Sequence, residues 1–198
     1  MGSGMNNTVL SLAVAGDNTL YAGGDFTTAG GVTVNRIAKW NGSTWSSLLS
    51  GGGMNDAVRA LAVFGNTIYF GGSFTTAYGS PAGRVGKFDG FNFSAMGSGM
   101  NGDVNAIAVS DTIIYVGGAF TNAQGTAANR IVQWNGSTWS AVGAGMDDTV
   151  NALALSGNTL YAGGLFTTAG GNTANRIAKW NGNTWSAQAA GLAATSTH

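Results

Sequence analysis

The sequence contains no cysteine and no glutamate, and its single histidine is the terminal residue, His198. Without cysteine, the chain can form neither disulfide bonds nor a thiolate nucleophile. A serine hydrolase triad lacks its histidine base within the repeats, and a catalytic pair of carboxylates has no glutamate to draw on. The sequence therefore predicts a protein that is not an enzyme and that binds no cofactor and no metal ion.

Charge of either sign is also scarce. Charged residues make up 8% of the chain, against about 25% in a typical soluble protein, and the net charge is zero. A neutral chain gives no reason to expect nucleic acid or an anionic membrane surface as a partner. No apolar run approaches the roughly 18 residues that a membrane span requires. We therefore expect no nucleic-acid binding and no membrane insertion.

Glycine, in contrast, is abundant at 34 residues, and it recurs in a fixed pattern. A Gly-Gly pair followed by Phe-Thr is found four times, at spacings of 48, 46 and 46 residues. The second glycine of each pair is Gly24, Gly72, Gly118 or Gly164. Self-similarity at this period indicates an array of small units, each of which buries its apolar faces against its neighbours.

Each repeat contains four segments with the pattern of short strands. In the first repeat these read TVLSLAVA, TLYAGG, NRIAKW and STWSSL. The first segment places the large Leu12 and Val14 on one face and the small Ser11 and Ala13 on the other. We expect a large face to nest against the small face of a neighbouring unit. The glycine pair predicts a bulge or a close backbone approach in the second strand.

The third and fourth segments are joined by Asn41-Gly42. This dipeptide predicts a two-residue type I′ hairpin loop, because that turn needs a positive φ at both positions. The resulting register places Trp40 opposite Ser43. It also puts Arg36 on the same face as Trp45, within reach of a cation–π contact.

Four strands in a unit of about 46 residues are typical of a β-propeller blade. We predict an all-β fold, with residues 1–198 forming one domain of four antiparallel, four-stranded, kelch-like blades. The expected blades are residues 5–52, 53–98, 99–144 and 145–191, followed by a polar tail at 192–198.

The Gly23-Gly24 pair followed by two spaced aromatic residues, Trp40 and Trp45, resembles the kelch motif. The wording GGDFTTAGG…NRIAKWNG is similar to the Delta-60-type and kelch-like repeats of bacterial and fungal surface proteins. This resemblance implies a propeller whose first strand is innermost, and it suggests an extracellular or cell-surface location and an interaction role. Kelch-like propellers mostly have six or seven blades, so four repeats raise the question of how the ring closes.

Two recurring sets of side chains are candidate ligand-binding residues. A propeller would arrange the four arginines as a ring that could bind an anion or an acidic sugar, and the tryptophans could stack on sugar rings. In the preferred interpretation both sets are structural: the arginines bind backbone carbonyls and the tryptophans fill the space between blades. The candidates are Arg36, Arg84, Arg130, Arg176, Trp40, Trp45, Trp134, Trp139, Trp180 and Trp185.

The sequence thus favours a non-catalytic β-propeller module that acts as a scaffold or a protein-interaction surface. Its N-terminal MGSGMN matches the internal junction at 96–101, as if the chain were cut from a longer array. The alternative is a lectin-like glycan binder with one equivalent site per blade. An open arc of four blades would expose apolar strands, so we expect a homo-oligomer, with a dimer completing an eight-bladed ring.

Overall fold

The computed structural model describes residues 3–50, 52–111 and 113–188. The predicted tail at 192–198 and the end of the predicted fourth blade lie outside the described residues. Four antiparallel sheets of four strands each follow one another along the chain. They confirm the predicted all-β architecture. Within the described ranges, no helix is long and apolar enough to cross a membrane.

Each blade pairs its strands in chain order from the first segment to the fourth. The first blade consists of β1 (Val9–Val14), β2 (Leu20–Gly24), β5 (Ile37–Trp40) and β6 (Trp45–Ser46). The second consists of β7 (Val58–Phe64), β8 (Thr67–Gly72), β11 (Val85–Phe88) and β12 (Phe93–Ala95). The third consists of β13 (Val104–Val109), β14 (Ile114–Gly118), β17 (Ile131–Trp134) and β18 (Trp139–Ala141). The fourth consists of β19 (Val150–Ser156), β20 (Thr159–Gly164), β23 (Ile177–Trp180) and β24 (Trp185–Ala187).

A short hairpin between the second and third strands of each blade was not foreseen from the sequence. In the first blade its two-residue loop is Gly30-Gly31, with φ of 57° and 85°. Positive φ at both positions is the requirement of a type I′ turn, which the sequence pattern predicts at Asn41-Gly42 instead. These hairpins are β3 (Thr28–Ala29) with β4 (Val32–Thr33), β9 (Thr76–Ala77) with β10 (Ser80–Pro81), β15 (Asn122–Ala123) with β16 (Thr126–Ala127), and β21 (Thr168–Ala169) with β22 (Asn172–Thr173).

The predicted register of the outer hairpin is wrong. Trp40 lies opposite Trp45, so the loop contains the four residues 41–44 rather than two. The carboxamide oxygen of Asn41 accepts hydrogen bonds from the backbone N–H groups of Ser43 and Thr44, with an N···O distance of 2.9 Å in each. Only Gly42 in this loop has a positive φ. An Asx turn therefore closes the hairpin, because the side chain of Asn41 caps two backbone donors at once.

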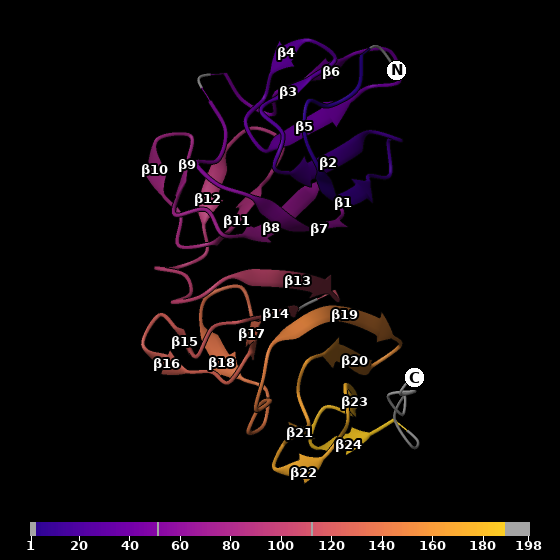
Figure 1. The fold of residues 1–198 in the computed structure, drawn as a ribbon, viewed down its shortest axis with the longest axis vertical. Coiled ribbons are helices and arrows are strands. Elements are labelled where there is room, and N and C mark those ends of the chain that lie inside the picture. The colour runs from indigo at the N-terminus through magenta and orange to yellow at the C-terminus, as the bar shows by residue number, and fades with distance from the viewer. Residues whose placement is uncertain (1–2, 51, 112, 189–198) are drawn as a thin grey trace, which may run out of the picture.

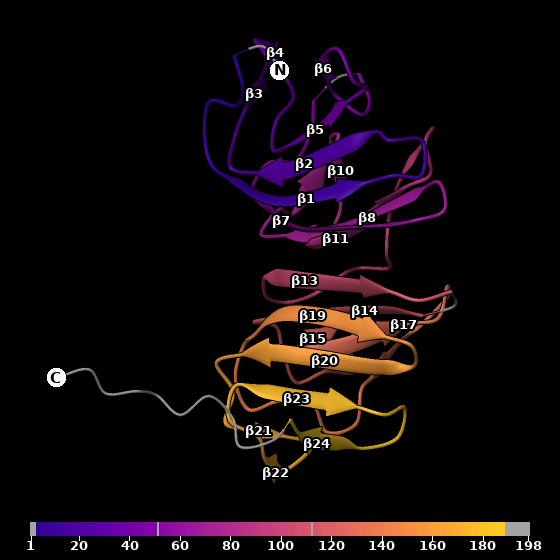
Figure 2. The same cartoon turned by 90° about the vertical axis from the view of Figure 1, so that its right-hand side faces the viewer.

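The innermost strands carry the contacts between consecutive blades. β1, β7, β13 and β19 lie in succession through the middle of the molecule (Figure 2). The first valine of each inner strand packs against the first glycine of the pair in the preceding blade. A Cβ placed on Gly23 would lie 2.6 Å from Val58 Cγ1, and one on Gly71 would lie 2.2 Å from Val104 Cγ1. We call this contact the valine–glycine joint; Val150 and Gly117 form the third one.

The joints nest a large face on a small one, as the alternation in the first strand predicted. In the second joint, Ile107 and Val104 belong to one apolar cluster with Ala60, Ala62 and Tyr69 of the preceding blade. The first strand of the second blade bulges opposite the glycine pair Gly71-Gly72, because the β7–β8 register shifts between Val58 and Ala60. The predicted close approach at the glycine pair is thus present, whereas the extra residue of the bulge, Arg59, lies in the first strand and not in the second.

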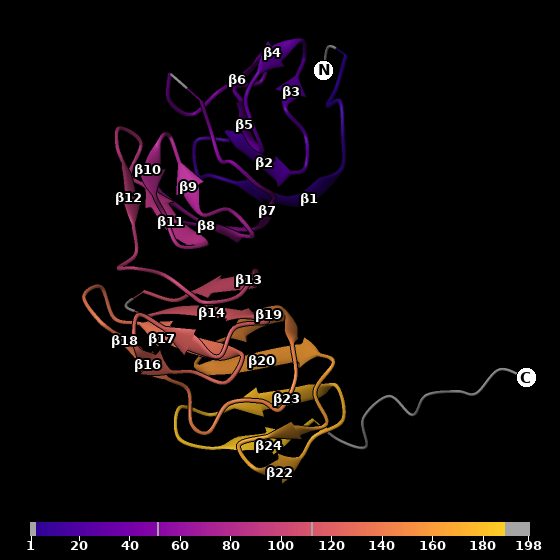
Figure 3. The same ribbon diagram turned by 60° about the vertical axis from the view of Figure 1, so that its left-hand side comes forward.

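The four blades form an open arc. The β3–β4 hairpin of the first blade and the β21–β22 hairpin of the fourth lie at opposite extremes of the molecule (Figures 1 and 3). On β1, Leu12 and Val14 are 60% and 63% exposed, whereas the equivalent Leu61 and Ile107 in the next two blades are each 9% exposed. The outward face of the first blade therefore has no blade packed against it within the described chain.

The joints predict a steric cost for any side chain on their glycines. Gly117→Ala places a methyl group 2.6 Å from Val150 Cγ1, so we expect a loss of about 1–3 kcal/mol in the free energy of unfolding, the usual range for overpacking. Gly16→Ala is the matched control, because a Cβ added there would have no atom within 4 Å. Urea unfolding of both variants at one protein concentration measures the difference; equal stabilities would contradict the joint.

Candidate functional site

The four recurring arginines lie just before the third strand of each blade, not within it. Their φ angles are 76° for Arg36, 69° for Arg84, 65° for Arg130 and 69° for Arg176, all in the left-handed region. The backbone N–H of Arg130 donates to the Phe120 carbonyl at 3.0 Å, and the Arg130 carbonyl accepts from Gly118 at 3.0 Å. The expectation that the arginine shares a strand face with the tryptophans is therefore wrong, because this turn precedes the strand.

The guanidinium groups donate to backbone carbonyl oxygens. Three of them donate to the carbonyl oxygen of the residue that directly follows the glycine pair of their own blade. The pairs are Arg36 with Asp25, Arg130 with Ala119 at 3.1 Å, and Arg176 with Leu165. Arg84 differs, since it donates to the Met100 carbonyl of the next blade at 3.0 Å. In the first, third and fourth blades these bonds tie the arginine turn to the segment after the second strand, whereas in the second blade the bond reaches the next blade.

A small polar network joins the second and third blades. The Asp103 carboxylate lies 3.6 Å from Arg84 Nε and 3.8 Å from Arg59 Nε. The Ser73 hydroxyl donates to the same carboxylate at 2.9 Å. Because these side chains are substantially exposed, the ion pairs contribute only about 0–1 kcal/mol. Within the described chain, no equivalent ion pair recurs at the other joints.

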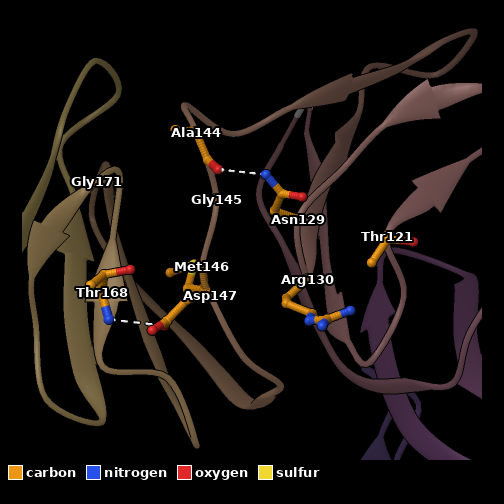
Figure 4. A pocket seen from close by; sticks show the side chains of 9 residues that line it. All are labelled: Thr121, Asn129, Arg130, Ala144, Gly145, Met146, Asp147, Thr168 and Gly171. Carbon is orange, nitrogen blue, oxygen red and sulfur yellow. Dashed lines mark hydrogen bonds between the residues drawn. The ribbon is translucent and has the colours of Figure 1, made fainter.

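An open groove of about 360 Å³ runs between the third and fourth blades (Figure 4). Asn129 and Arg130 line one side, and Asp147 lines the other. The Asn129 carboxamide donates to the Ala144 carbonyl at 3.0 Å, and the Met146 N–H donates to the Asn129 carbonyl at 3.0 Å. The groove is polar, but its side chains already bind the backbone around them.

Asp147 caps the short hairpin of its own blade. Its carboxylate accepts from the Thr167 and Thr168 N–H groups at 2.8 and 2.9 Å and from the Thr167 hydroxyl at 2.6 Å. The Thr167 hydroxyl, followed by these N–H groups, lowers the pKa of Asp147 to about 2. Three equivalent asparagines cap the other hairpins through the same pattern; they are Asn6, Asn55 and Asn101. The polar residues at the blade junctions are thus hairpin caps.

In the first, third and fourth blades two tryptophans form a pair across the outer hairpin. Their ring centroids are 5.4 Å apart for Trp40 and Trp45, 4.8 Å for Trp134 and Trp139, and 5.4 Å for Trp180 and Trp185, with the planes tilted by 44–51°. All of these rings are buried except that of Trp40, which is half-buried. Phe88 and Phe93 occupy the two positions in the second blade.

Two indole nitrogens cross to the preceding blade. Trp139 Nε1 donates to the Met96 carbonyl at 3.1 Å, and Trp185 Nε1 donates to the Val142 carbonyl at 2.8 Å. Trp45 Nε1 is buried as well, yet it has no hydrogen-bond partner among the described residues. A tilted aromatic pair with an inter-blade hydrogen bond is a packing unit, and its buried faces are not available to a sugar ring.

The recurring polar side chains form hydrogen bonds with backbone groups. Arginines, asparagines and Asp147 hold turns and carbonyls in place. Among the residues that the structure describes, no three histidine, cysteine, aspartate or glutamate side chains gather to hold a metal ion.

A second groove, which was not predicted from the sequence, lies between the β1–β2 turn of the first blade and the β7–β8 and β11–β12 turns of the second. It measures about 260 Å³ and is lined by Asp17, Tyr21, Asp89 and Phe91, among others. Phe91 is 82% exposed. The only signal in the sequence is a departure from the repeat, since serine stands at this position in the first and third blades.

Both carboxylates of this groove are ionised at neutral pH. Backbone N–H groups lower the pKa of Asp17 through Thr19, and that of Asp89 through Asn92 and Phe91. The groove therefore combines an exposed aromatic ring with two negative charges. We refer to it as the Phe91 groove.

Comparisons with known proteins agree with this architecture. The family model of a β-propeller domain of unknown function, DUF5122, matches residues 15–42. No curated protein matches the chain. The WD40 β-propeller domain of Doa1 is similar in structure, with a TM-score of 0.60 at 13% identity over 97% of this chain and 57% of that one. The chain folds as a β-propeller.

Two computationally designed proteins are also similar to this propeller. The Ika8 protein has a TM-score of 0.61 at 22% identity over 90% of this chain and 47% of that one. The Ika4 protein has a TM-score of 0.59 at 18% identity over 91% of this chain and 94% of that one. The propeller thus spans about half the length of the Ika8 chain. These matches support β-propeller repeats in general, and the narrower kelch-like or Delta-60-type assignment stays a prediction.

Burial of the tryptophan pairs predicts a large stability loss on truncation. Trp139→Ala removes a buried ring and leaves the Met96 carbonyl without its donor, so we expect a loss of about 3–5 kcal/mol in the free energy of unfolding. Trp139→Phe keeps most of the ring and should cost less, about 1–3 kcal/mol for the unsatisfied carbonyl. Chemical denaturation measures both; a loss below about 1 kcal/mol for the alanine variant would indicate an exposed ring.

The cap at Asp147 predicts a titration near pH 2. Because its pKa is lowered in the folded state, its contribution to stability is present above about pH 4, where the unfolded group is ionised. That contribution is lost as the pH falls towards 2. Thr167→Val removes the largest cause and should move the carbon-detected NMR titration of Asp147 upwards. Thr184→Val, whose hydroxyl contacts Asn181 instead, should leave it unchanged; a midpoint near the ordinary aspartate value of about 4 in the wild type would refute the cap.

Proposed function

We propose that this propeller is a non-catalytic protein-interaction module and that the Phe91 groove is its contact surface. The observation that carries the proposal is an aromatic side chain, 82% exposed, beside two ionised carboxylates in one groove. Exposed aromatic residues are favoured anchors of protein interfaces. The groove fits a protein segment that presents an apolar side chain next to a lysine or arginine.

Several observations support a scaffold rather than a catalyst. The recurring polar side chains hold turns and blade contacts, and the chain has no cysteine and only a terminal histidine. One similar structure, with a TM-score of 0.53 at 19% identity over 80% of this chain and 48% of that one, belongs to the Mitotic Checkpoint Complex. A chain of this fold is therefore a component of a protein assembly in that case.

The glycan-binding alternative has less support. Its stacking platforms would have to be the tryptophan pairs, whose rings are largely buried. The arginine positions remain a proposed structural set, because three of the four guanidinium groups bind carbonyls of their own blade. A cell-surface location rests on the resemblance alone. We also propose that the module works as a homo-oligomer, since the first blade exposes its apolar face.

Random peptide display on the purified chain tests the Phe91 groove. We expect enrichment of peptides with a basic residue beside an aromatic or aliphatic one. Phe91→Ser introduces the residue found in the first and third blades and should weaken the best peptide by about tenfold or more, the loss typical of an interface anchor. Val32→Ser is the matched control, because Val32 is 44% exposed in the β3–β4 hairpin, away from the groove.

The outcomes separate the two functions. Peptide binding that depends on Phe91 and not on Val32 supports the interaction module. Binding to a glycan array without any peptide enrichment would favour the lectin-like alternative, and peptide binding that is indifferent to Phe91→Ser would place the contact surface elsewhere.

A further inference from the structure

The two ends of the arc carry the two unmatched halves of the valine–glycine joint. Inside the chain this joint is made three times, by Val58 with Gly23, by Val104 with Gly71 and by Val150 with Gly117. Every valine in these joints is fully buried. A fourth valine, Val9, and a fourth glycine, Gly163, stand at the equivalent positions without a partner in the described chain.

The first blade supplies the large half of the missing joint. Val9 is 39% exposed, whereas the three equivalent valines have no exposed surface. Leu12 and Val14, which continue the apolar surface of β1, are exposed as well. In the second and third blades this surface is covered by the small residues of the preceding blade.

The fourth blade supplies the small half. Among the described residues beyond its two sequence neighbours, the atoms nearest to a Cβ added at Gly163 would be the Arg176 carbonyl oxygen at 3.8 Å and the Ala152 Cβ at 3.9 Å, so this part of the chain leaves the hollow open. Ala152 is exposed here, although the equivalent Ala60 and Ala106 are buried. Leu165, which follows the glycine pair, is 50% exposed.

We infer that a second copy of this chain completes the joint. Val9 of one protomer enters the hollow at Gly163 of the partner subunit, and the reverse contact is made at the other end, so that two copies close one ring of eight blades. This inference rests on the homo-oligomer part of the proposed function and names its interface. The interface is head-to-tail, and two such contacts related by a two-fold axis leave no blade face open.

The choice of a second copy follows from complementarity within the chain. The surface that covers an inner strand in each internal joint is the small face of a preceding blade, and the only such face left uncovered in the described chain is on the fourth blade. The two faces lie apart in one protomer (Figure 1). The arc also superposes on only 57% of the Doa1 propeller domain, so four blades of this curvature cover part of a ring there.

Cysteine cross-linking tests the joint directly, because the chain has no cysteine of its own. In the equivalent internal joint, a Cβ on Gly23 would lie 3.1 Å from Val58 Cβ, a few tenths of an ångström below the Cβ separation of a disulfide, about 3.5–4.5 Å. Val9→Cys and Gly163→Cys should therefore cross-link to each other when combined in one chain. Val32→Cys combined with Gly163→Cys is the matched control and should not cross-link.

The expected result is a single covalent dimer band on a non-reducing denaturing gel for the Val9→Cys, Gly163→Cys variant. Each single variant alone should give no cross-link, because a head-to-tail contact never brings Val9 to Val9. Cross-linking of Val9→Cys to itself would overturn the head-to-tail interface. A ladder of higher multimers would overturn the closed pair.

Native mass spectrometry separates failure of the joint from failure of the assembly. The wild type is expected at twice 19.8 kDa. A wild type of single mass would refute both the homo-oligomer and the joint, while leaving the Phe91 groove untouched. A wild-type dimer whose cysteine variant does not cross-link would refute the joint alone.

A second variant tests the same interface without a cross-link. Gly163→Val fills the hollow, yet no atom of the described chain beyond its two sequence neighbours lies nearer than 3.8 Å to the new Cβ, so the protomer should keep its circular dichroism spectrum. We expect loss of the dimer at micromolar concentration for this variant and for Leu12→Asp. Val32→Asp, also on an exposed valine, should stay dimeric; a Gly163→Val dimer as stable as the wild type would overturn the inference.

Discussion

The valine–glycine joint is the contact on which the rest of this propeller depends. Three of the four inner strands set one valine into a space that exists only because the strand of the preceding blade has no side chain there. Steric exclusion of this kind fixes the distance and the register between blades together, since a shift of one residue would bring a side chain against the valine. Opposite each glycine pair the first strand of the same blade carries a bulge, and the second glycine lies too close to that strand's backbone to carry a side chain.

Around the joints, polar side chains hold the loops rather than offer themselves to a ligand. Asn41 and its equivalents close the outer hairpins, while Asn6, Asn55, Asn101 and Asp147 cap the short hairpins. In three blades, arginine bonds to carbonyls tie the turn before the third strand to the segment after the second strand. Only 8% of the residues are charged, so few other side chains can hydrogen-bond to the buried and half-buried backbone groups. These polar side chains therefore have a structural role. A binding surface that differs between blades requires exposed residues that depart from the repeat, such as Phe91.

The sequence predicted the period, the four strands of each blade and the close approach at the glycines, because spacing and residue size carry that information directly. It misplaced the type I′ turn, since Asn41-Gly42 and Gly30-Gly31 both satisfy the local rule, and the side-chain bonds of Asn41 decide between them only in three dimensions. It also placed Arg36 on a strand, where a left-handed φ is not expected for arginine. For the candidate site, residue type suggested tryptophan and arginine, whereas exposure singled out Phe91. Exposure depends on packing, which no single repeat contains.

The outer faces of the first and fourth blades differ from those of capping units. Open repeat arrays stay soluble by means of capping units whose outer faces are polar. Here the first blade keeps Val9, Leu12 and Val14, the same apolar surface that its successors bury, and the fourth blade keeps the small residues that would receive it. Neither face has been replaced by charge, although an exposed apolar inner strand invites uncontrolled association. The first and fourth blades of this chain thus retain the two halves of the contact that its internal blades use. This complementarity favours the proposed ring, completed by a second copy, over a capped solenoid.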